Sequence, residues 1–407
     1  MTSDVTTDSA VDFDPFSVDF FDNPHAVYRR LRNEAPVYHN TKYGFWALSR
    51  YEDVAPAMKD CETYSSARGV TLDMFLDPEP RTLSAPLIIM MDPPEHTRMR
   101  KLVNKVFTPR AVTALESMVR QTICDAAAKV DPDSFDAVAD FAALFPVEVI
   151  TTMLGVPPAD RQQLRQWTAA GLHREAGKLG PTQAGIEATR SSARYYYELA
   201  LQRRANPRDD MISRLTQVEV ERDDGTTTAL TDIEIVGFCT MLGSAGAETV
   251  AKLIGSAVVT FAANPDQWQQ LRSDRGKIPA AVEELLRYDG PVQYDIRYNM
   301  RDVHVRGRTI PKGNPVMMLV ASATRDEAAF PDADRFDINR AHSGHNLAFG
   351  YGIHSCLGAA LARMESRIAL DVLLELIPSY DVDTAGLTRV AASNVGGWHN
   401  VPVRSSR

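Results

Sequence analysis

The sequence contains little cysteine: four residues in 407, and no two of them form a CxxC pair. They are Cys61, Cys124, Cys239 and Cys356. This spacing excludes a disulfide framework and offers no zinc-binding pattern, so reduced thiols in a cytoplasmic protein are expected. Long hydrophobic runs are missing as well. No stretch reaches the roughly 18 uninterrupted apolar residues that cross a bilayer, and no apolar leader follows Met1, so we expect no membrane span.

Basic residues are fewer than acidic ones. Lysine and arginine number 44 against 53 acidic residues, which gives a formal net charge of -9. Because the chain has no lysine-rich block or basic tail, it is not expected to bind nucleic acid. Six aspartates precede Arg29, the first lysine or arginine. Residues 1–14 are therefore predicted to form a disordered acidic tail.

Repeats, low-complexity tracts and long linkers are absent, and 44% hydrophobic with 24% charged residues is an ordinary globular composition. Helical patterns cover 24–34, dominate from Pro94 to about Tyr288, and return from Cys356 to about Leu376. Strand-like pieces gather towards the two ends, at 38–49, 303–305, 316–320 and 398–403, with 310–313 as a turn. The sequence predicts one domain over 15–407, mainly α with a minor β region.

A long apolar helix is predicted after residue 230. Thr231 and Glu234 form a capping-box pattern, and the apolar run continues to Ala263, where Asn264-Pro265 stops it. That is about 30 residues, or roughly 45 Å at 1.5 Å per residue, enough to cross the whole domain. Glu248, Thr249 and three glycines interrupt the run. A helix with only a structural role would have little use for them.

Cys356 lies in the segment Phe349-Gly350-Tyr351-Gly352-Ile353-His354-Ser355-Cys356-Leu357-Gly358, a glycine-rich loop that runs into a helix. Glycines let a backbone approach a flat macrocycle and aim its N–H groups at the sulfur. Those N–H groups and the positive end of the following helix favour a thiolate, which suits the axial ligand of a haem iron. The alternative is an ordinary buried cysteine after a turn, which is the usual state of a free cysteine.

The pattern Phe-Gly-x-Gly-x-His-x-Cys-x-Gly resembles the haem-ligand signature of the cytochrome P450 monooxygenases at every fixed position. The resemblance extends from about residue 15 to Arg404, in the style of soluble bacterial members. It implies the cytochrome P450 fold, in which haem b (iron protoporphyrin IX) lies between a long central helix and the helix after the cysteine loop. Cys356 would be the axial iron ligand, and Phe349 and Gly350 would border the haem.

Ala245-Gly246-Ala247-Glu248-Thr249 resembles the oxygen-activation segment of this family. Ala245 and Gly246 would leave room for O2 and let the helix open locally. The Thr249 hydroxyl would hydrogen-bond the bound oxygen, and Glu248 would relay protons from solvent. The alternative is a close helix–helix crossing with a surface glutamate.

Two basic residues are predicted at the edge of an apolar helix face in 94–107. At 100° per residue His96 and Arg100 lie about 40° apart there, while Arg98, Lys101 and Lys105 fall on the opposite side. The resemblance assigns His96 and Arg100 to the haem propionates, together with Arg297 and His354. The opposite side is a candidate docking surface for an electron donor. Its alternative is an ordinary solvated basic face.

Glu284 and Arg287 are an i, i+3 pair that on its own would be a commonplace surface feature. The resemblance implies a buried network instead, completed by Arg335, which holds the cysteine loop and does no chemistry.

The resemblance implies a monooxygenase that inserts one atom of O2 into an organic substrate. Because the chain has neither G-x-G-x-x-G nor a spare cysteine cluster, electrons would come from a separate ferredoxin or flavodoxin with its reductase. The apolar candidates for the pocket favour a small hydrophobic substrate, such as a lipid, terpenoid or steroid, although Arg174 or Lys178 would suit a carboxylate. We expect a monomer. The substrate candidates are Leu72, Phe75, Leu87, Met241, Ser244, Val292, Ile296 and Val395.

Two rival functions remain open on the sequence. A peroxygenase or isomerase on the same fold needs no redox partner, but such variants often lose the acid–threonine pair that this chain keeps. A non-catalytic haem sensor or electron carrier would need no substrate pocket, and the apolar segment 70–90 is where the family has a substrate loop. The alternative for that segment is a packed core loop.

Overall fold

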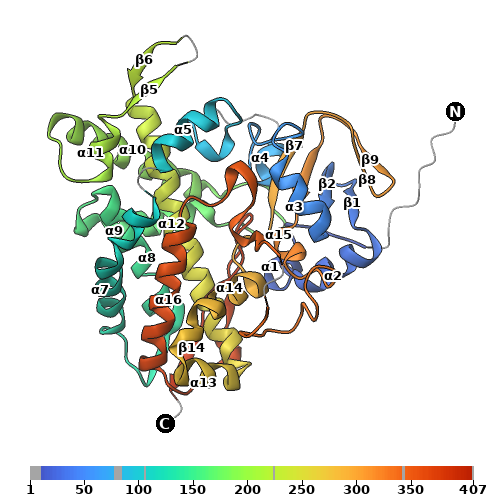
Figure 1. Ribbon diagram of the computed structural model, residues 1–407, viewed down its shortest axis with the longest axis vertical. Coiled ribbons are helices and arrows are strands. Elements are labelled where there is room, and N and C mark those ends of the chain that lie inside the picture. The colour runs from blue at the N-terminus through green and yellow to red at the C-terminus, as the bar shows by residue number, and fades with distance from the viewer. Residues whose placement is uncertain (1–10, 78–84, 105–106, 223–224, 342–343, 406–407) are drawn as a thin grey trace.

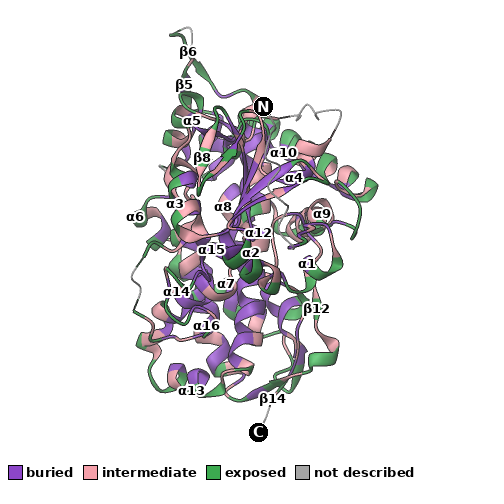
Figure 2. Ribbon diagram, turned by 90° about the vertical axis from the view of Figure 1, so that its right-hand side faces the viewer, coloured by how far each residue is buried: buried purple, intermediate pink, exposed green. Residues whose placement is uncertain are grey.

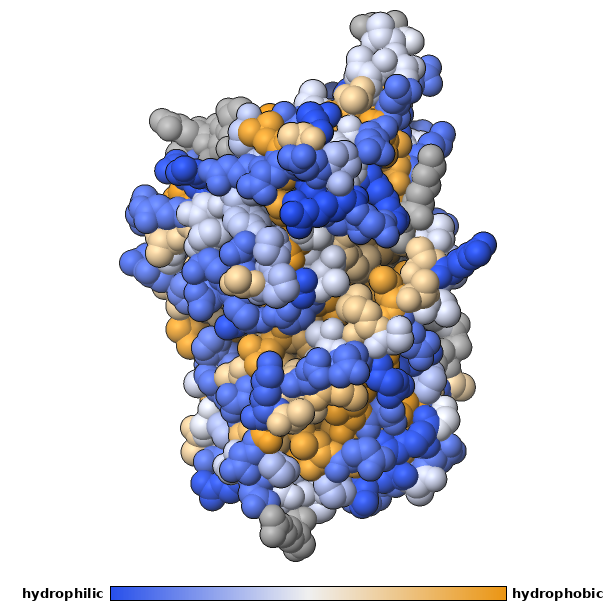
Figure 3. All heavy atoms as spheres, turned by 90° about the vertical axis from the view of Figure 1, so that its left-hand side faces the viewer, coloured by the Kyte–Doolittle hydropathy of each residue, from blue (hydrophilic) through white to orange (hydrophobic). Residues whose placement is uncertain are grey.

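The computed structural model describes residues 11–77, 85–104, 107–222, 225–341 and 344–405. Most of the helices gather on one side of the molecule and the five-stranded sheet on the other (Figure 1). The described chain is mainly α with a minor β region, as the sequence predicts. Buried residues concentrate in the middle of the molecule and exposed ones follow its outline (Figure 2). Hydrophilic side chains cover most of one face, with apolar ones in patches between them (Figure 3).

The α-helices are α1 (Val18–Asp22), α2 (His25–Glu34), α3 (Tyr51–Lys59), α4 (Leu72–Leu76), α5 (Glu95–Asn104), α6 (Pro109–Thr113), α7 (Glu116–Ala127), α8 (Phe145–Leu154), α9 (Arg161–Leu172), α10 (Gln183–Ala205), α11 (Met211–Leu215), α12 (Asp232–Ala262), α13 (Pro265–Ser273), α14 (Ile278–Asp289), α15 (Val320–Ala323) and α16 (Ala359–Leu376). The strands outside the main sheet are β4 (Ser134–Asp136), β5 (Glu219–Glu221), β6 (Thr227–Ala229), β8 (Val303–Val305), β9 (Arg308–Ile310), β11 (Tyr380–Val382), β12 (Thr388–Arg389), β13 (Trp398–Asn400) and β14 (Pro402–Ser405).

Helix α12 runs through the centre of the molecule beside α16 (Figure 1). Its predicted capping box is confirmed, because the Glu234 N–H donates to Thr231 Oγ1 at 3.2 Å and the Thr231 N–H donates to Glu234 Oε2 at 2.7 Å. In the described residues two segments, 137–154 and 232–262, are long and apolar enough to span a membrane. The protein buries 61% of the first and 67% of the 18-residue apolar window in the second, as expected of core helices.

The main sheet has the strand order β1-β2-β10-β7-β3. Its strands are Val37–Asn40, Phe45–Leu48, Pro315–Met318, Asp295–Asn299 and Tyr64–Ser65 in that order. Strand β10 pairs in parallel with β2 and antiparallel with β7, so that Val316 lies opposite both Trp46 and Arg297. The register therefore fixes Arg297 on a central strand. The sequence prediction of one turn at 310–313 missed β9, which forms a hairpin with β8 before that turn.

The predicted acidic tail is wrong for residues 11–14. Val11 is 3% exposed and Phe13 1% exposed, and both pack in an aromatic cluster with Phe20 and Tyr28. The Asn40 side chain also donates to the Phe13 carbonyl at 2.7 Å. Apolar side chains between the aspartates therefore bring this segment into the core. Residues 1–10 of the predicted tail lie outside the described residues.

Candidate active site

The loop before α16 is shaped by two glycines in left-handed conformations. Gly350 has φ 71° and Gly352 φ 79°. A Cβ at Gly352 would lie 2.9 Å from both the Met58 carbonyl oxygen and the Lys59 Cα, so only glycine fits there. The Cys356 N–H donates to the Phe349 carbonyl at 2.7 Å and closes the loop. This geometry fixes Cys356 immediately before the first turn of α16.

The thiol of Cys356 is accessible at the surface of this loop. Desolvation by surrounding protein atoms raises the pKa of Cys356, while the Gly358 N–H and the cations of Arg100 and Arg363 act in the opposite direction and favour the thiolate. A Cβ at Gly358 would meet no atom within 4 Å, so the chain leaves open space at the start of α16. The Arg363 guanidinium lies over the Phe349 ring, 4.4 Å from its centroid. These features suit a thiolate that faces a large flat partner.

Four basic residues from three separate segments converge near the cysteine. His96 and Arg100 come from α5, Arg297 from β7 and His354 from the loop itself. The rings of His96 and His354 lie 4.3 Å apart between centroids. Burial lowers the pKa of His354 to about 3, with a further contribution from the charges of Arg297, His96 and Arg100. The ring contact joins α5 to the cysteine loop, and the charges of Arg297 and Arg100 act on the same His354 imidazole.

This basic cluster has room for anionic partners. His96 is 2% exposed, yet its Nε2 is buried without a hydrogen-bond partner. Arg297, at 5% exposed, has the Asp295 carboxylate no closer than 3.7 Å, and Arg100 donates to the Ser355 carbonyl at 2.5 Å. Buried cations need a compensating negative charge, and a buried imidazole nitrogen needs a hydrogen-bond partner. The cluster therefore fits a group that carries carboxylates, as the two propionates of haem b do.

The helical wheel of α5 agrees with the burial of His96 and Lys101, but it does not separate Arg98 from Arg100, which are both half-buried. His96 is buried with Met99, while Lys101 is exposed on the other side and Arg98 is half-buried. Lys105, the third residue of the predicted basic face, lies outside the described residues.

The segment 245–249 lies within an unbroken α-helix, so no local opening is present. Ala245 is exposed although its neighbours are largely buried, and its carbonyl accepts a hydrogen bond from Thr249 Oγ1 at 3.0 Å. A Cβ at Gly246 would lie 2.9 Å from Cγ1 of Ile150 on α8. The close approach of α8 therefore explains the glycine at position 246. The residue of this segment that is exposed is Ala245.

Glu248 is not a surface glutamate. Its side chain is 12% exposed and forms an ion pair with Lys252, whose Nζ lies 3.3 Å from Glu248 Oε2 and whose side chain is 10% exposed. Lys252 was not predicted as a site residue. A lysine four residues after Glu248 in an apolar helix could have indicated this ion pair from the sequence.

The Glu284–Arg287 pair is fully buried, with side chains 0% and 1% exposed. Arg287 donates to the two carboxylate oxygens at 2.7 and 2.8 Å, and to the Thr324 and Ala333 carbonyls. The prediction that Arg335 completes the network is wrong: its side chain is 70% exposed and lies 3.7 Å from Asp337. Arg340 occupies that place instead, with Nε 3.1 Å from Glu284 Oε1.

Two of the predicted substrate contacts are wrong. Leu72 and Ile296 are each 0% exposed and pack in the N-terminal aromatic cluster, with Phe75 at its edge. A side chain fully enclosed by other side chains has no surface for a ligand. The remaining candidates, Leu87, Met241, Ser244, Val292 and Val395, are half-buried, and Val292 and Val395 lie opposite each other in an antiparallel bridge.

Arg174 is occupied within the protein. Its Nε and one terminal nitrogen lie 3.1 and 3.0 Å from Asp73 Oδ2. Its other terminal nitrogen donates to three backbone carbonyls, those of Gly171, Leu172 and His173. Lys178 pairs with Glu175. Arg174 is therefore not free to receive a substrate carboxylate in this conformation, whereas the Lys178 pair is exposed to solvent.

Comparison with known proteins identifies the family. The family model described as Cytochrome P450 matches residues 180–384. The chain is similar to a putative cytochrome P450 123 of Mycobacterium tuberculosis, 40% identical over 96% of both chains. It is 37% identical to the vitamin D(3) 25-hydroxylase of Pseudonocardia autotrophica, over 90% of this chain and 89% of that protein.

Solved structures agree over nearly the whole length. Cytochrome P450 CYP109Q5 from Chondromyces apiculatus has a TM-score of 0.85 at 33% identity, covering 97% of this chain and 98% of its own. CYP109E1 from Bacillus megaterium in complex with testosterone has a TM-score of 0.85 at 31% identity, covering 95% and 98%. The chain belongs to the cytochrome P450 family and is a monooxygenase whose cofactor is haem b.

Proposed function

We propose that this protein oxygenates an uncharged hydrophobic small molecule of the lipid, terpenoid or steroid class, with Cys356 as the axial ligand of its haem. The observation that carries the cofactor assignment is the convergence of His96, Arg100, Arg297 and His354 beside the Cys356 loop, with His96 Nε2 left unpartnered. When bound, haem b supplies an iron at which O2 is reduced, and a thiolate ligand favours O–O cleavage.

The chain's own residues would bind and position this chemistry. The four basic groups would hold the propionates by charge-assisted hydrogen bonds. Ala245, which is exposed near the middle of α12, would leave space for O2. Thr249 Oγ1, which now donates to the Ala245 carbonyl, would hold a proton beside that space, and Glu248 would deliver protons to it.

The charges that are already paired support the proposed substrate class. Arg174 is committed to Asp73 and to backbone carbonyls, so a substrate carboxylate would have to break a buried ion pair to use it. The relative named vitamin D(3) 25-hydroxylase and the neighbour solved with testosterone also favour a bulky uncharged substrate.

Electrons would come from a separate ferredoxin or flavodoxin with its reductase. The exposed Lys101, on the side of α5 opposite His96, is a candidate part of that docking surface. We place the protein in the cytoplasm as a monomer, with its cysteines reduced. Analytical ultracentrifugation of the haem-loaded protein tests the oligomeric state.

Two experiments test this function. The ferrous carbonyl complex should absorb at the long-wavelength position diagnostic of thiolate ligation, and Cys356→Ser should lose that band. Retention of the band would show that another residue is the ligand. A matched ligand panel should give a substrate-induced Soret shift with a neutral steroid and none with a fatty acid of similar size. The reverse result would contradict the proposed substrate class.

A further inference from the structure

Lys252 is a buried lysine in the middle of the central helix. The residue is 8% exposed, and its neighbours Ala251 and Leu253 are 1% and 3% exposed. Transferring an ammonium group from water into such surroundings is unfavourable unless a partner compensates for it. A structural helix would be better served by an apolar residue at this position. The lysine therefore requires an explanation.

Its partner is the acid of the oxygen-activation segment. Lys252 Nζ lies 3.3 Å from Glu248 Oε2, one helical turn away, and both side chains are almost enclosed. Gly397 packs directly against the Lys252 side chain. Its φ is 141°, and a Cβ there would lie 2.7 Å from Lys252 Cβ and 3.2 Å from its Cγ. The aliphatic stem is thus confined, which restricts where the ammonium group can lie.

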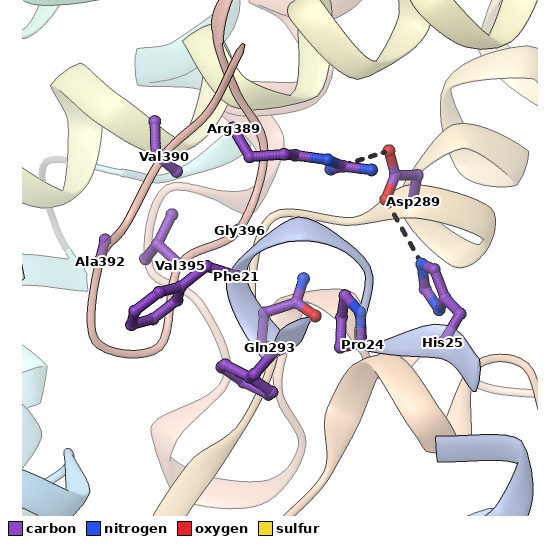
Figure 4. Close-up of a pocket in the computed structure, with 11 residues that line it drawn as sticks. Phe21, Pro24, His25, Asp289, Gln293, Arg389, Val390, Ala392, Val395 and Gly396 are labelled. Atoms are coloured by element: carbon purple, nitrogen blue, oxygen red, sulfur yellow. Dashed lines mark ion pairs between the residues drawn. The ribbon is translucent and has the colours of Figure 1, made fainter. Parts of the chain in front are cut away.

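A separate group of buried polar side chains lies further along the same side of α12. Ser256, one turn further and 2% exposed, hydrogen-bonds to the Asp289 carboxylate. Asp289 lies beside a small pocket with His25 at 3.6 Å and Arg389 at 4.0 Å, and the Gln293 side chain lines the same pocket (Figure 4). His25 Nδ1, Gln293 Oε1 and Arg389 Nε are buried without partners. The pocket is small and suits about one water molecule.

We propose that Lys252 is a positioning residue for oxygen activation: its ammonium group fixes the Glu248 carboxylate next to Thr249 and returns a proton to it after each delivery. The proposal rests on the role of Glu248 proposed above. In each cycle a proton moves from Lys252 Nζ to Glu248 Oε2 and on towards Thr249 Oγ1. The neutral amine then takes one proton from water, so that the net supply is one solvent proton.

Other titratable groups on elements packed against α12 define the electrostatic background. Among them are Asp140 before α8, Glu148 with Arg161 on α8 and α9, Tyr196 and Arg203 on α10, Asp289 on α14, Glu365 on α16 and His399 on β13. Arg389, on β12, lies near Asp289. Glu148 is paired with Arg161 at 3.1 Å, and Asp289 with His25 and Arg389. Asp140 and His399 are exposed. Burial raises the pKa of Glu365 well above the ordinary value.

The test uses haem-loaded Lys252→Met and Lys252→Arg, with Ser256→Ala as a control that removes a buried polar group one turn away. The titration of Glu248 is followed by pH-difference infrared spectroscopy and assigned with Glu248→Gln. Without its cation the buried carboxyl should titrate at least about one pH unit higher in Lys252→Met, a tenfold change in the protonation equilibrium. Lys252→Arg should restore the titration, and Ser256→Ala should leave it unchanged.

Coupling of NAD(P)H consumption to product is measured over the same pH range. We expect its pH profile to move with the Glu248 titration in Lys252→Met. If Lys252→Met titrates like the wild type, or if arginine does not restore the titration, the positioning role is overturned. If Glu248→Gln itself leaves coupling unchanged, the proposed role of Glu248 fails instead, and the two failures are thus distinct.

A folding defect would also be informative. If Lys252→Met fails to fold, the double variant Glu248→Gln with Lys252→Met should recover the fold, because it removes both charges of the pair. A double variant that folds no better than Lys252→Met would overturn the pairing.

Discussion

Replacing Arg340 should destabilise the protein far more than replacing Arg335, although both lie near the buried Glu284. The Arg340 side chain is 11% exposed and donates to Glu284 at 3.1 Å, to the Asp332 carbonyl at 3.0 Å and to the Arg335 carbonyl at 2.7 Å. The Arg335 side chain is 70% exposed and is within ion-pair distance only of Asp337 among the described residues. The two arginines therefore differ in burial and in the number of groups they satisfy.

The magnitude follows from these contacts. Hydrogen bonds to charged groups contribute about 1.5–3 kcal/mol each, and removing one member of a fully buried ion pair costs about 3–5 kcal/mol. Because Arg287 still pairs with Glu284 after the change, we expect Arg340→Ala to lower the free energy of unfolding by about 2–4 kcal/mol. For Arg335→Ala we expect about 0–0.5 kcal/mol, as for an exposed pair.

Equilibrium denaturation of the two haem-loaded variants, followed by circular dichroism and by the Soret band, measures the difference. The protein as a whole is expected to be stable by about 5–15 kcal/mol, so the Arg340 effect should be a large part of the total. Equal losses for the two variants would refute the network as described here. An intact fold with lost haem in Arg340→Ala would instead place its effect at the cysteine loop.

Thr249→Ala should leave haem and substrate binding nearly intact but divert electrons to peroxide, and unchanged coupling would remove Thr249 from the mechanism. Gly352→Ala should lower the free energy of unfolding by about 1–3 kcal/mol and reduce haem retention, because the φ of this residue is 79° and its new Cβ would contact Met58. Gly44→Ala is the control for backbone strain alone, since Gly44 has a φ of 66° and no atom within 4 Å of a new Cβ. Burial lowers the pKa of His25, so the free energy of unfolding should fall as pH drops below about 6.5, and His25→Gln should flatten that dependence. Lys101→Glu should slow reduction by ferredoxin most at low salt without changing substrate affinity, and equal rates across a salt series would place the docking surface elsewhere.

Local signals in the sequence predicted the parts of the fold that local interactions determine. The Thr231–Glu234 capping box and Asn264-Pro265 bound α12 to within a residue or two, because both act within one helical turn. The residues around Cys356 carried enough of the family pattern to name the cofactor. Arg297 could be placed near His354 only through the resemblance, since the pairing of β7 with β10 brings it there.

The errors have physical causes of their own. Arg340 lies 56 residues from Glu284 in sequence, and nothing local distinguishes it from the exposed Arg335. Leu72 and Ile296 are apolar, and an apolar side chain suits a packed cluster as well as a ligand pocket. Val11 and Phe13 are flanked by aspartates, so the composition of this segment indicated disorder. In the structure these two apolar side chains pack in the core and determine where the segment lies.

The parallel pairing of β2 with β10 has a consequence for synthesis on the ribosome. Trp46 pairs with Val316, so the main sheet stays incomplete until more than three quarters of the chain has been made. The haem-binding groups are also far apart in the sequence. His96 is synthesised long before Arg297 and Cys356, so the site cannot form until those residues are present. Contacts so far apart in sequence form slowly and leave apolar strands exposed in the meantime. Chains that terminate before about residue 356 should therefore bind no haem through a cysteine thiolate and depend on chaperones while they are held on the ribosome.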